Sequence, residues 1–317
     1  MRTKTLRSDL LLLVAAFIWG TTFVAQRMGM SHIGPMTYNA LRFALGAVTL
    51  VPVILVLPVN GQVADRNRGV RFLLCGGALA GLALFGGASM QQIGLIYTTA
   101  GKAGFITSLY VVLVPIIGRI LGQRIGLSVW AGAVLAVAGL YLLSFTGSFA
   151  VGRGDLPVLI GAFFWAVHVH LIGYLAKRAN PLRIACLQFV TCSALSLVAA
   201  LPYEEIAIVP IRQATVPILY GGVLSAGVAF TLQVICQRTS PPAHAAIVMS
   251  LETVFAALAG YVILHERLGP RDLAGCALML AGLIVVQLPL LFNSPSTHPA
   301  GVRQRSGSQA GWQRQGR

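Results

Sequence analysis

Glu252 is the acidic residue that lies deepest within a long apolar run of this sequence. Ionising a carboxyl group in such surroundings costs free energy, so the group either faces a cavity, finds a partner or stays protonated. One interpretation is that Glu252 binds a proton or the ammonium group of a substrate. The other is that it remains a protonated carboxyl that hydrogen-bonds between helices.

Two cations also lie within or beside apolar runs. Lys102 stands in the segment Ala-Gly-Lys-Ala-Gly, whose small residues let a helix or a ligand approach the backbone closely. Lys102 either holds a carboxylate, pairs with an acid, or extends to the membrane surface. Arg42 lies a few residues into its own run, and the same choice applies: a cavity charge, an interhelical contact or an extended surface residue.

Aromatic and uncharged polar side chains within apolar runs are further candidates for a binding cavity. Trp19 and Trp165 lie well inside their runs, whereas tryptophans that anchor a helix at the membrane surface lie near its ends. Packing between helices is the alternative role. The same argument selects Tyr38, Gln92, Tyr110, His168 and Gln233 as cavity residues.

Metals and cofactors are not expected. His168 and His170 are two positions apart on a helix, so their side chains point to nearly opposite faces. The five cysteines lie inside apolar stretches without the spacing of metal ligands, and we interpret them as small buried apolar residues.

The composition identifies the elements that must position these residues. Of 317 residues, 56% are apolar and only about 10% are charged, and the mean hydropathy is +0.80. A soluble domain carries roughly 25% charged residues, so this chain is neither an ordinary soluble globule nor disordered over most of its length. The net charge of +15 does not indicate nucleic-acid binding, because the basic residues stand between long apolar runs, as in membrane-protein loops.

Ten apolar stretches are long enough for a helix that crosses a membrane, which needs about 20 residues. The sequence therefore predicts an all-α membrane protein with short connecting loops. The first stretch resembles a signal peptide but is expected to remain uncleaved. The expected spans are Leu10–Met28, Thr37–Pro58, Phe72–Ile96, Ala100–Leu121, Leu127–Thr146, Asp155–Ala176, Arg183–Pro202, Thr215–Cys236, Ala243–Leu264 and Arg271–Phe292. Pro115 predicts a kink in the fourth span.

The distribution of lysine and arginine predicts the orientation. With ten spans both termini lie on one side, and most basic residues fall on that side, for example Arg2, Lys4, Arg7, Lys177 and Arg178. By the positive-inside rule this side is the cytoplasm. We therefore expect a multi-pass protein of the cell inner membrane, with residues 293–317 forming a disordered basic cytoplasmic tail.

The two halves of the chain resemble each other. Asp9-Leu10 and Trp19 correspond to Asp155-Leu156 and Trp165, and Ala138-Gly139-Leu140 corresponds to Ala281-Gly282-Leu283. Each half, residues 8–146 and 155–292, then holds five spans. Because five is odd, the second half enters the membrane with the opposite orientation, a design shared by many secondary transporters.

Several motifs resemble the EamA family of the drug/metabolite transporter superfamily. They are Trp19-Gly20-Thr21-Thr22-Phe23, Leu41-Arg42-Phe43, the segment from Tyr97 through Lys102 to Pro115, and Ser250-Leu251-Glu252-Thr253 ending in His265-Glu266-Arg267-Leu268. The first half departs from this pattern at one place, because it has Gln123-Arg124-Ile125 where the second half has Glu266-Arg267-Leu268. The resemblance implies export or import of amino acids, other metabolites or drugs, by exchange or with protons.

The favoured function is therefore secondary active transport of a small organic metabolite, an amino acid or related compound, by alternating access. A multidrug efflux transporter of the same superfamily is the alternative. A polytopic membrane enzyme is disfavoured, because the sequence has no Walker lysine loop, no His-Glu-x-x-His and no Gly-x-Ser-x-Gly. The expected partners are the substrate, the lipid bilayer and possible coupling protons, in a monomer or homodimer.

Overall fold

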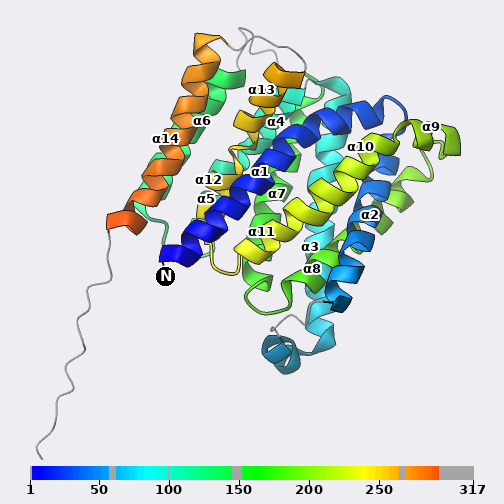
Figure 1. Cartoon of the computed structure of the whole chain (residues 1–317), viewed down its shortest axis with the longest axis horizontal. Helices are drawn as coiled ribbons and strands as arrows, with labels where there is room; N and C mark the ends of the chain where they lie inside the picture. The colour runs from blue at the N-terminus through cyan, green and yellow to red at the C-terminus, as the bar shows by residue number, and fades with distance from the viewer. Residues whose placement is uncertain (1, 57–61, 99, 145–151, 264–268, 293–317) are drawn as a thin grey trace, which may run out of the picture.

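The computed structural model describes residues 2–56, 62–98, 100–144, 152–263 and 269–292, and within these ranges all regular structure is helical (Figure 1). Its elements are α1 (Arg2–Met30), α2 (Pro35–Val56), α3 (Gln62–Tyr97), α4 (Ala100–Ser108), α5 (Tyr110–Ile120), α6 (Leu127–Ser144), α7 (Asp155–Leu175), α8 (Pro181–Ala200), α9 (Ile208–Gln213), α10 (Thr215–Leu219), the π-helical η1 (Tyr220–Phe230), α11 (Thr231–Cys236), α12 (Pro242–Met249), α13 (Glu252–Ile263) and α14 (Pro270–Phe292).

Nine helical segments of the described residues are long and apolar enough to cross a membrane, and they match nine of the expected spans. The fifth expected span corresponds to α6, whose apolar part, Leu127–Leu142, is shorter than the others. Its expected end, Thr146, lies outside the described residues, as do Pro58, Leu264 and residues 293–317. The prediction of an all-α membrane protein is thus confirmed.

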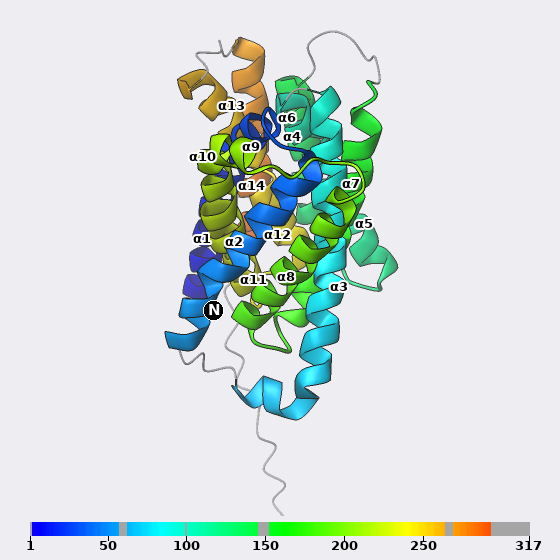
Figure 2. The same cartoon turned by 90° about the vertical axis from the view of Figure 1, so that its right-hand side faces the viewer.

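Local sequence sets where several helices begin. Proline occupies the first position of α2, α8, α12 and α14, where its missing N–H is not needed. Asn180 precedes α8, and its side-chain oxygen accepts hydrogen bonds from Leu182 N (3.0 Å) and Arg183 N (3.3 Å). In α3, Gly69 adopts a positive φ of 74°, so the helical residues before it turn away from the membrane-spanning part (Figure 2).

Successive spans run in alternating directions, so half of them begin at one end of the bundle and half at the other (Figures 1 and 2). We call the end at which α1 begins the near face and the opposite end the far face. Helices α1, α8 and α12 begin at the near face. Helices α4, α7 and α14 begin at the far face.

The two halves pack against each other reciprocally. α3 of the first half packs on α7 of the second, and α1 packs on the equivalent of α3, the segment α10–η1–α11. Likewise α4 and α5 contact α7, while α12 and α13 contact α1. The second spans, α2 and α8, pack together, as do the last spans, α6 and α14.

The crossing of α6 and α14 depends on glycine. A Cβ atom added to Gly132 would lie 2.8 Å from the carbonyl oxygen of Gly282, and one added to Gly139 would lie 2.5 Å from that of Gly275. Only glycine allows the two backbones to approach this closely. Gly132 and Gly275 are equivalent in the sequence repeat, as are Gly139 and Gly282. At the crossing, Gly132 therefore packs on the equivalent of Gly139, and Gly139 packs on the equivalent of Gly132.

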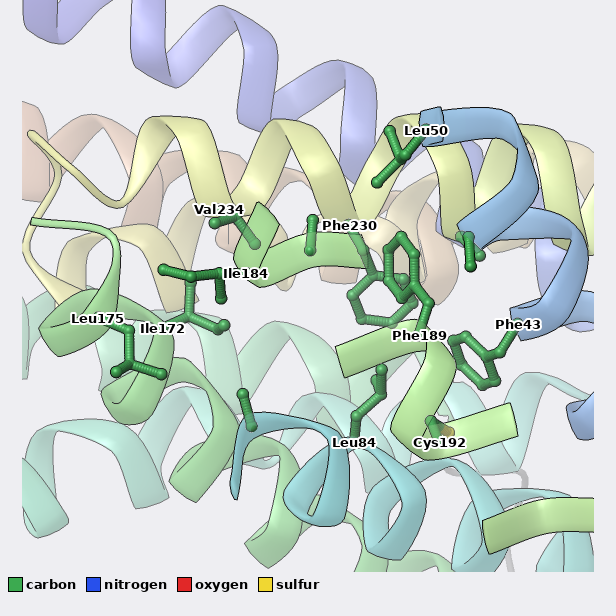
Figure 3. Packing of buried hydrophobic residues seen from close by; sticks show 14 of the residues in the cluster. Phe43, Leu50, Leu84, Ile172, Leu175, Ile184, Phe189, Cys192, Phe230 and Val234 are labelled. Atoms are coloured by element: carbon green, nitrogen blue, oxygen red, sulfur yellow. The ribbon is translucent and has the colours of Figure 1, made fainter. Parts of the chain in front are cut away.

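The largest apolar cluster lies between α2, α3, α7, α8 and η1. The rings of Phe43, Phe189 and Phe230 meet there, with centroids 6.0 to 6.2 Å apart (Figure 3). On the outside of the bundle, large apolar side chains such as Val48, Leu55 and Leu127 are exposed. This arrangement fits a protein whose outer surface contacts lipid.

Candidate functional site: a central cavity

A cavity lies between the two halves. Its wall has one cationic side chain, one carboxyl, several uncharged polar groups and a group of large aromatic rings. The lining residues are Trp19, Thr22, Phe23, Gln26, Arg42, Gln91, Thr107, Tyr110, Trp165, Val169, Ser225, Phe230, Gln233, Met249 and Glu252.

Two interrupted helices meet beside this cavity. The fourth span breaks at Leu109, between α4 and α5, and the ninth breaks at Ser250–Leu251, between α12 and α13. Both breaks contain tighter backbone bonds, from Leu109 N to Ile106 O (3.2 Å) and from Leu251 N to Val248 O (3.3 Å). Interrupted helices are typical of substrate sites in transporters with repeated halves.

Glu252 begins α13, directly after one of these breaks, and is 5% exposed. Its Oε1 accepts a long hydrogen bond of 3.4 Å from the Ser108 hydroxyl, and the Tyr110 hydroxyl also hydrogen-bonds to it. Ser108 further bonds to Thr253 at 2.7 Å. Ser108 and Tyr110, which lie on either side of the break at Leu109, thus contact the carboxyl of Glu252, which follows the break at Ser250–Leu251.

Gln91 organises a second polar part of the wall. Its Oε1 accepts hydrogen bonds from Trp165 Nε1 (3.1 Å) and Thr107 Oγ1 (3.3 Å). Its Nε2 donates to Gln26 Oε1 at 3.1 Å. This network fixes the Trp165 ring at the cavity, whereas Trp19 Nε1 has no hydrogen-bond partner among the described residues.

Phe230 is the centre of the aromatic part of the wall. Its ring centroid lies 4.8 Å from that of Trp19 and 5.7 Å from that of Trp165, and it stacks nearly parallel to Trp165. Phe230 ends the π-helix η1, a geometry that is frequent at functional sites. Together these three rings, which we call the aromatic wall, offer an apolar surface made of ring faces and edges.

Arg42 contributes the cation. The side chain is 2% exposed, and its guanidinium carbon lies 4.6 Å from the Phe43 ring centroid and 5.5 Å from the Tyr38 centroid. Its Nε has no hydrogen-bond partner, and no ion pair to an acid is formed within the part of the chain that the structure describes. Arg42 and Glu252 share the cavity without pairing with each other.

The structure thus brings six of the ten predicted site residues to one cavity and leaves four elsewhere. Trp19, Arg42, Tyr110, Trp165, Gln233 and Glu252 line it. Tyr38 is buried behind Arg42 and donates to Pro217 O at 3.0 Å. His168 Nε2 bonds to Gln188 Oε1 at 2.8 Å, behind the aromatic wall. Gln92 is fully buried without a partner among the described residues, since consecutive helix residues differ by about 100° in direction and its neighbour Gln91 takes the cavity position.

Lys102 forms an ion pair at the far face. Its Nζ lies 2.7 Å from Asp155 Oδ2, which joins α4 of the first half to α7 of the second. At the near face, His244 Nε2 lies 2.8 Å from Asp9 Oδ1, and Gln287 Nε2 donates to Asp9 Oδ2 at 2.8 Å. We call these the far link and the near link.

Some wall residues escaped the sequence argument. Phe230 resembles any other phenylalanine in an apolar run, although the repeat aligns it with Phe85. Thr107 and Gln26 lie near helix ends, where polar residues are common. The break at Leu109 was expected instead at Pro115; the ring of this proline clashes with the carbonyl four residues earlier, that of Val111, so the helix is disturbed ahead of the proline.

Comparison with known proteins agrees with this geometry. The sequence profile of the EamA-like transporter family matches residues 6–145 and 152–288. The chain belongs to this family. Each matched segment covers one half of the bundle, so the family assignment includes both sides of the cavity.

Two relatives of this EamA-like chain have names that describe them as transporters. Their similarity to this chain extends over nearly their whole length. An "uncharacterized transporter" of Archaeoglobus fulgidus is 32% identical over 90% of this chain and 87% of its own. The "uncharacterized transporter YwfM" of Bacillus subtilis is 26% identical over 88% of this chain and 93% of its own. A solved structure, titled only as the crystal structure of a protein, shares the fold with a TM-score of 0.75 at 21% identity, covering 89% of this chain and 96% of that one.

Proposed function

We propose that this EamA-like protein is a secondary active transporter that moves a small organic metabolite, an amino acid or related compound, across the cell inner membrane by alternating access. The observation that carries this proposal is the central cavity, in which a buried carboxyl lies where two interrupted helices from different halves meet. A site built by both halves is exposed to one side or the other when the halves rock.

Two inverted five-helix halves, residues 8–146 and 155–292, are part of the proposal. The reciprocal contacts between the halves support it. The crossing of α6 and α14 also supports it, because Gly132 and Gly139 of the first half pack on the glycines equivalent to Gly139 and Gly132 in the second half. The basic residues near the ends of α1 and α7 support a cytoplasmic near face, with both termini in the cytoplasm.

Glu252 is proposed as the proton site. Its carboxyl is buried in the cavity wall, and the hydroxyls of Ser108 and Tyr110 lie against it. A proton taken up on one side and released on the other couples its flow to that of the substrate if both bias the same rocking of the halves. Exchange of two substrates is the variant of this mechanism without net proton flow.

The test is transport into liposomes that contain the purified protein, with and without a pH gradient. Glu252→Gln preserves the shape of the side chain and mimics its protonated form. We expect this variant to fold and insert but to lose pH-dependent transport. Glu205→Gln, which changes an exposed acid outside the cavity, is the matched control and should behave as wild type. Full activity of Glu252→Gln with an unchanged pH profile would exclude proton coupling at this residue.

Multidrug efflux is the second candidate function, because the aromatic wall beside a carboxyl also suits flat organic cations. The same liposomes distinguish the two functions. Broad transport of unrelated flat cations favours efflux, whereas selectivity for one metabolite class favours the first proposal.

A further inference from the structure

The geometry points to an organic carboxylate with a flat or apolar body as the substrate of the central cavity, with Arg42 binding the carboxylate and the aromatic wall binding the body. This inference rests on the proposed transport function and specifies the substrate class of the same cavity.

The first step of the argument is the unsatisfied cation. Arg42 is 2% exposed, and its Nε has no hydrogen-bond partner. The faces of Phe43 and Tyr38 lie beside the guanidinium, and they interact with a cation but accept no in-plane hydrogen bond. A buried charge is costly unless it is paired. The guanidinium is therefore suited to an anion that enters the cavity.

The second step excludes an acidic partner among the residues that the structure describes. Asp9 is held by the near link, Asp155 by the far link, and Glu204 accepts the backbone N–H groups of Met36 and Thr37 at 2.8 and 2.7 Å. Glu252 lines the same cavity as Arg42, but its described hydrogen bonds go to hydroxyl groups on α4 and α5.

The third step concerns the kind of anion. Arg42 is the one cation among the lining residues, so the wall balances a single negative charge. The planar guanidinium matches a carboxylate in a bidentate arrangement. A doubly charged phosphate ester would face one cation and an acidic residue, which is a poor balance of charge.

The fourth step concerns the rest of the molecule. Trp19, Trp165 and Phe230 present faces and edges of aromatic rings on the same cavity, and such surfaces favour another flat apolar group. Because Glu252 already has hydroxyl partners and is proposed to bind a proton, an ammonium group on the substrate is not required.

Three compounds with the same body separate these charges: 3-phenylpropionate, phenylalanine and phenethylamine. Binding to the purified protein in detergent is measured by titration calorimetry. We expect both carboxylates to bind and the amine, which has no carboxylate, to bind on the order of ten-fold more weakly or not at all. Equal or tighter binding of the amine, or no binding of either carboxylate, would overturn the inference.

Arg42→Gln should weaken binding of 3-phenylpropionate on the order of ten-fold or more, and Arg42→Lys should restore part of it. Arg178→Gln is the matched control, because Arg178 also lies over a tyrosine ring, that of Tyr174 at 3.8 Å, but does not line the cavity. Size-exclusion profiles establish that each variant is folded. If Arg42→Gln binds as wild type does, Arg42 is not the anchor.

Transport of the same compounds is measured separately in liposomes. Arg42-dependent binding without transport would retain the substrate class and refute the transport function. Transport of other organic molecules that is indifferent to Arg42→Gln would retain the function and refute the substrate class.

Discussion

The near link and the far link use the same plan at opposite ends of the bundle. Each has an aspartate from the first span of one half, Asp9 or Asp155, and a base from the fourth span of the other half. The base is the third residue of its helix in both cases, His244 in α12 and Lys102 in α4. The repeat thus places one acid–base pair between the halves at each face.

The two links differ in burial and in the basic residue. In the near link, the side chains of His244 and Asp9 are 7% and 5% exposed, and Gln287 occupies the second carboxylate oxygen. In the far link, those of Lys102 and Asp155 are 38% and 12% exposed. Water screens the far link, whereas the near link is isolated from it. The comparison teaches that equivalent positions in the two halves can form contacts that differ in burial and therefore in their sensitivity to salt.

Removing the shared acid of the near link is expected to have the largest effect. Asp9→Ala leaves His244 and Gln287 buried without their partner, so we expect the free energy of unfolding to fall by about 3 kcal/mol. Thermal unfolding in detergent measures this change. Asp272→Ala is the control, because Asp272 accepts a hydrogen bond from Gly269 N at the start of α14 and links no halves; it should cost about 1 kcal/mol. Equal costs for both variants would contradict the proposed importance of the near link.

Removing only the third member of the near link is expected to cost less. Gln287→Leu deletes the hydrogen bond to Asp9 Oδ2 but preserves the contact with His244. We expect a loss of about 1.5 kcal/mol, typical of a hydrogen bond to a charged group. In the double variant with Asp9→Ala the cost of Gln287→Leu should largely disappear, and full additivity of the two costs would show that the residues act independently.

The helices and much of the cavity could be predicted from the sequence because their signals are compositional. Long apolar runs specify the spans, and a tryptophan, arginine or glutamate inside such a run stands out, as Trp19, Arg42 and Glu252 do. The near link and the far link were harder to predict from the sequence. Lys102 was expected either to bind a ligand, to pair with an acid or to reach the surface, and only the packing of α4 on α7 selects Asp155 as its partner.

Other features depend on orientations that a sequence does not specify. Gln91 and Gln92 are chemically identical, and the rotation of α3 decides which one reaches the cavity. The helix interruption at Leu251 contains no glycine or proline from which it could be predicted. At this point the Ser250 hydroxyl donates a hydrogen bond to the Ile247 carbonyl at 2.9 Å and competes with the helical backbone.

Breaking the far link is expected to have a small effect. Lys102→Met removes an ion pair whose lysine is 38% exposed, and pairs of this kind contribute about 0 to 1 kcal/mol. The cost should shrink in high salt, whereas that of Asp9→Ala should not, because screening acts on exposed charges. Thermal unfolding at low and high salt compares the two variants. A salt-independent loss of several kcal/mol on Lys102→Met would contradict the distinction between the links.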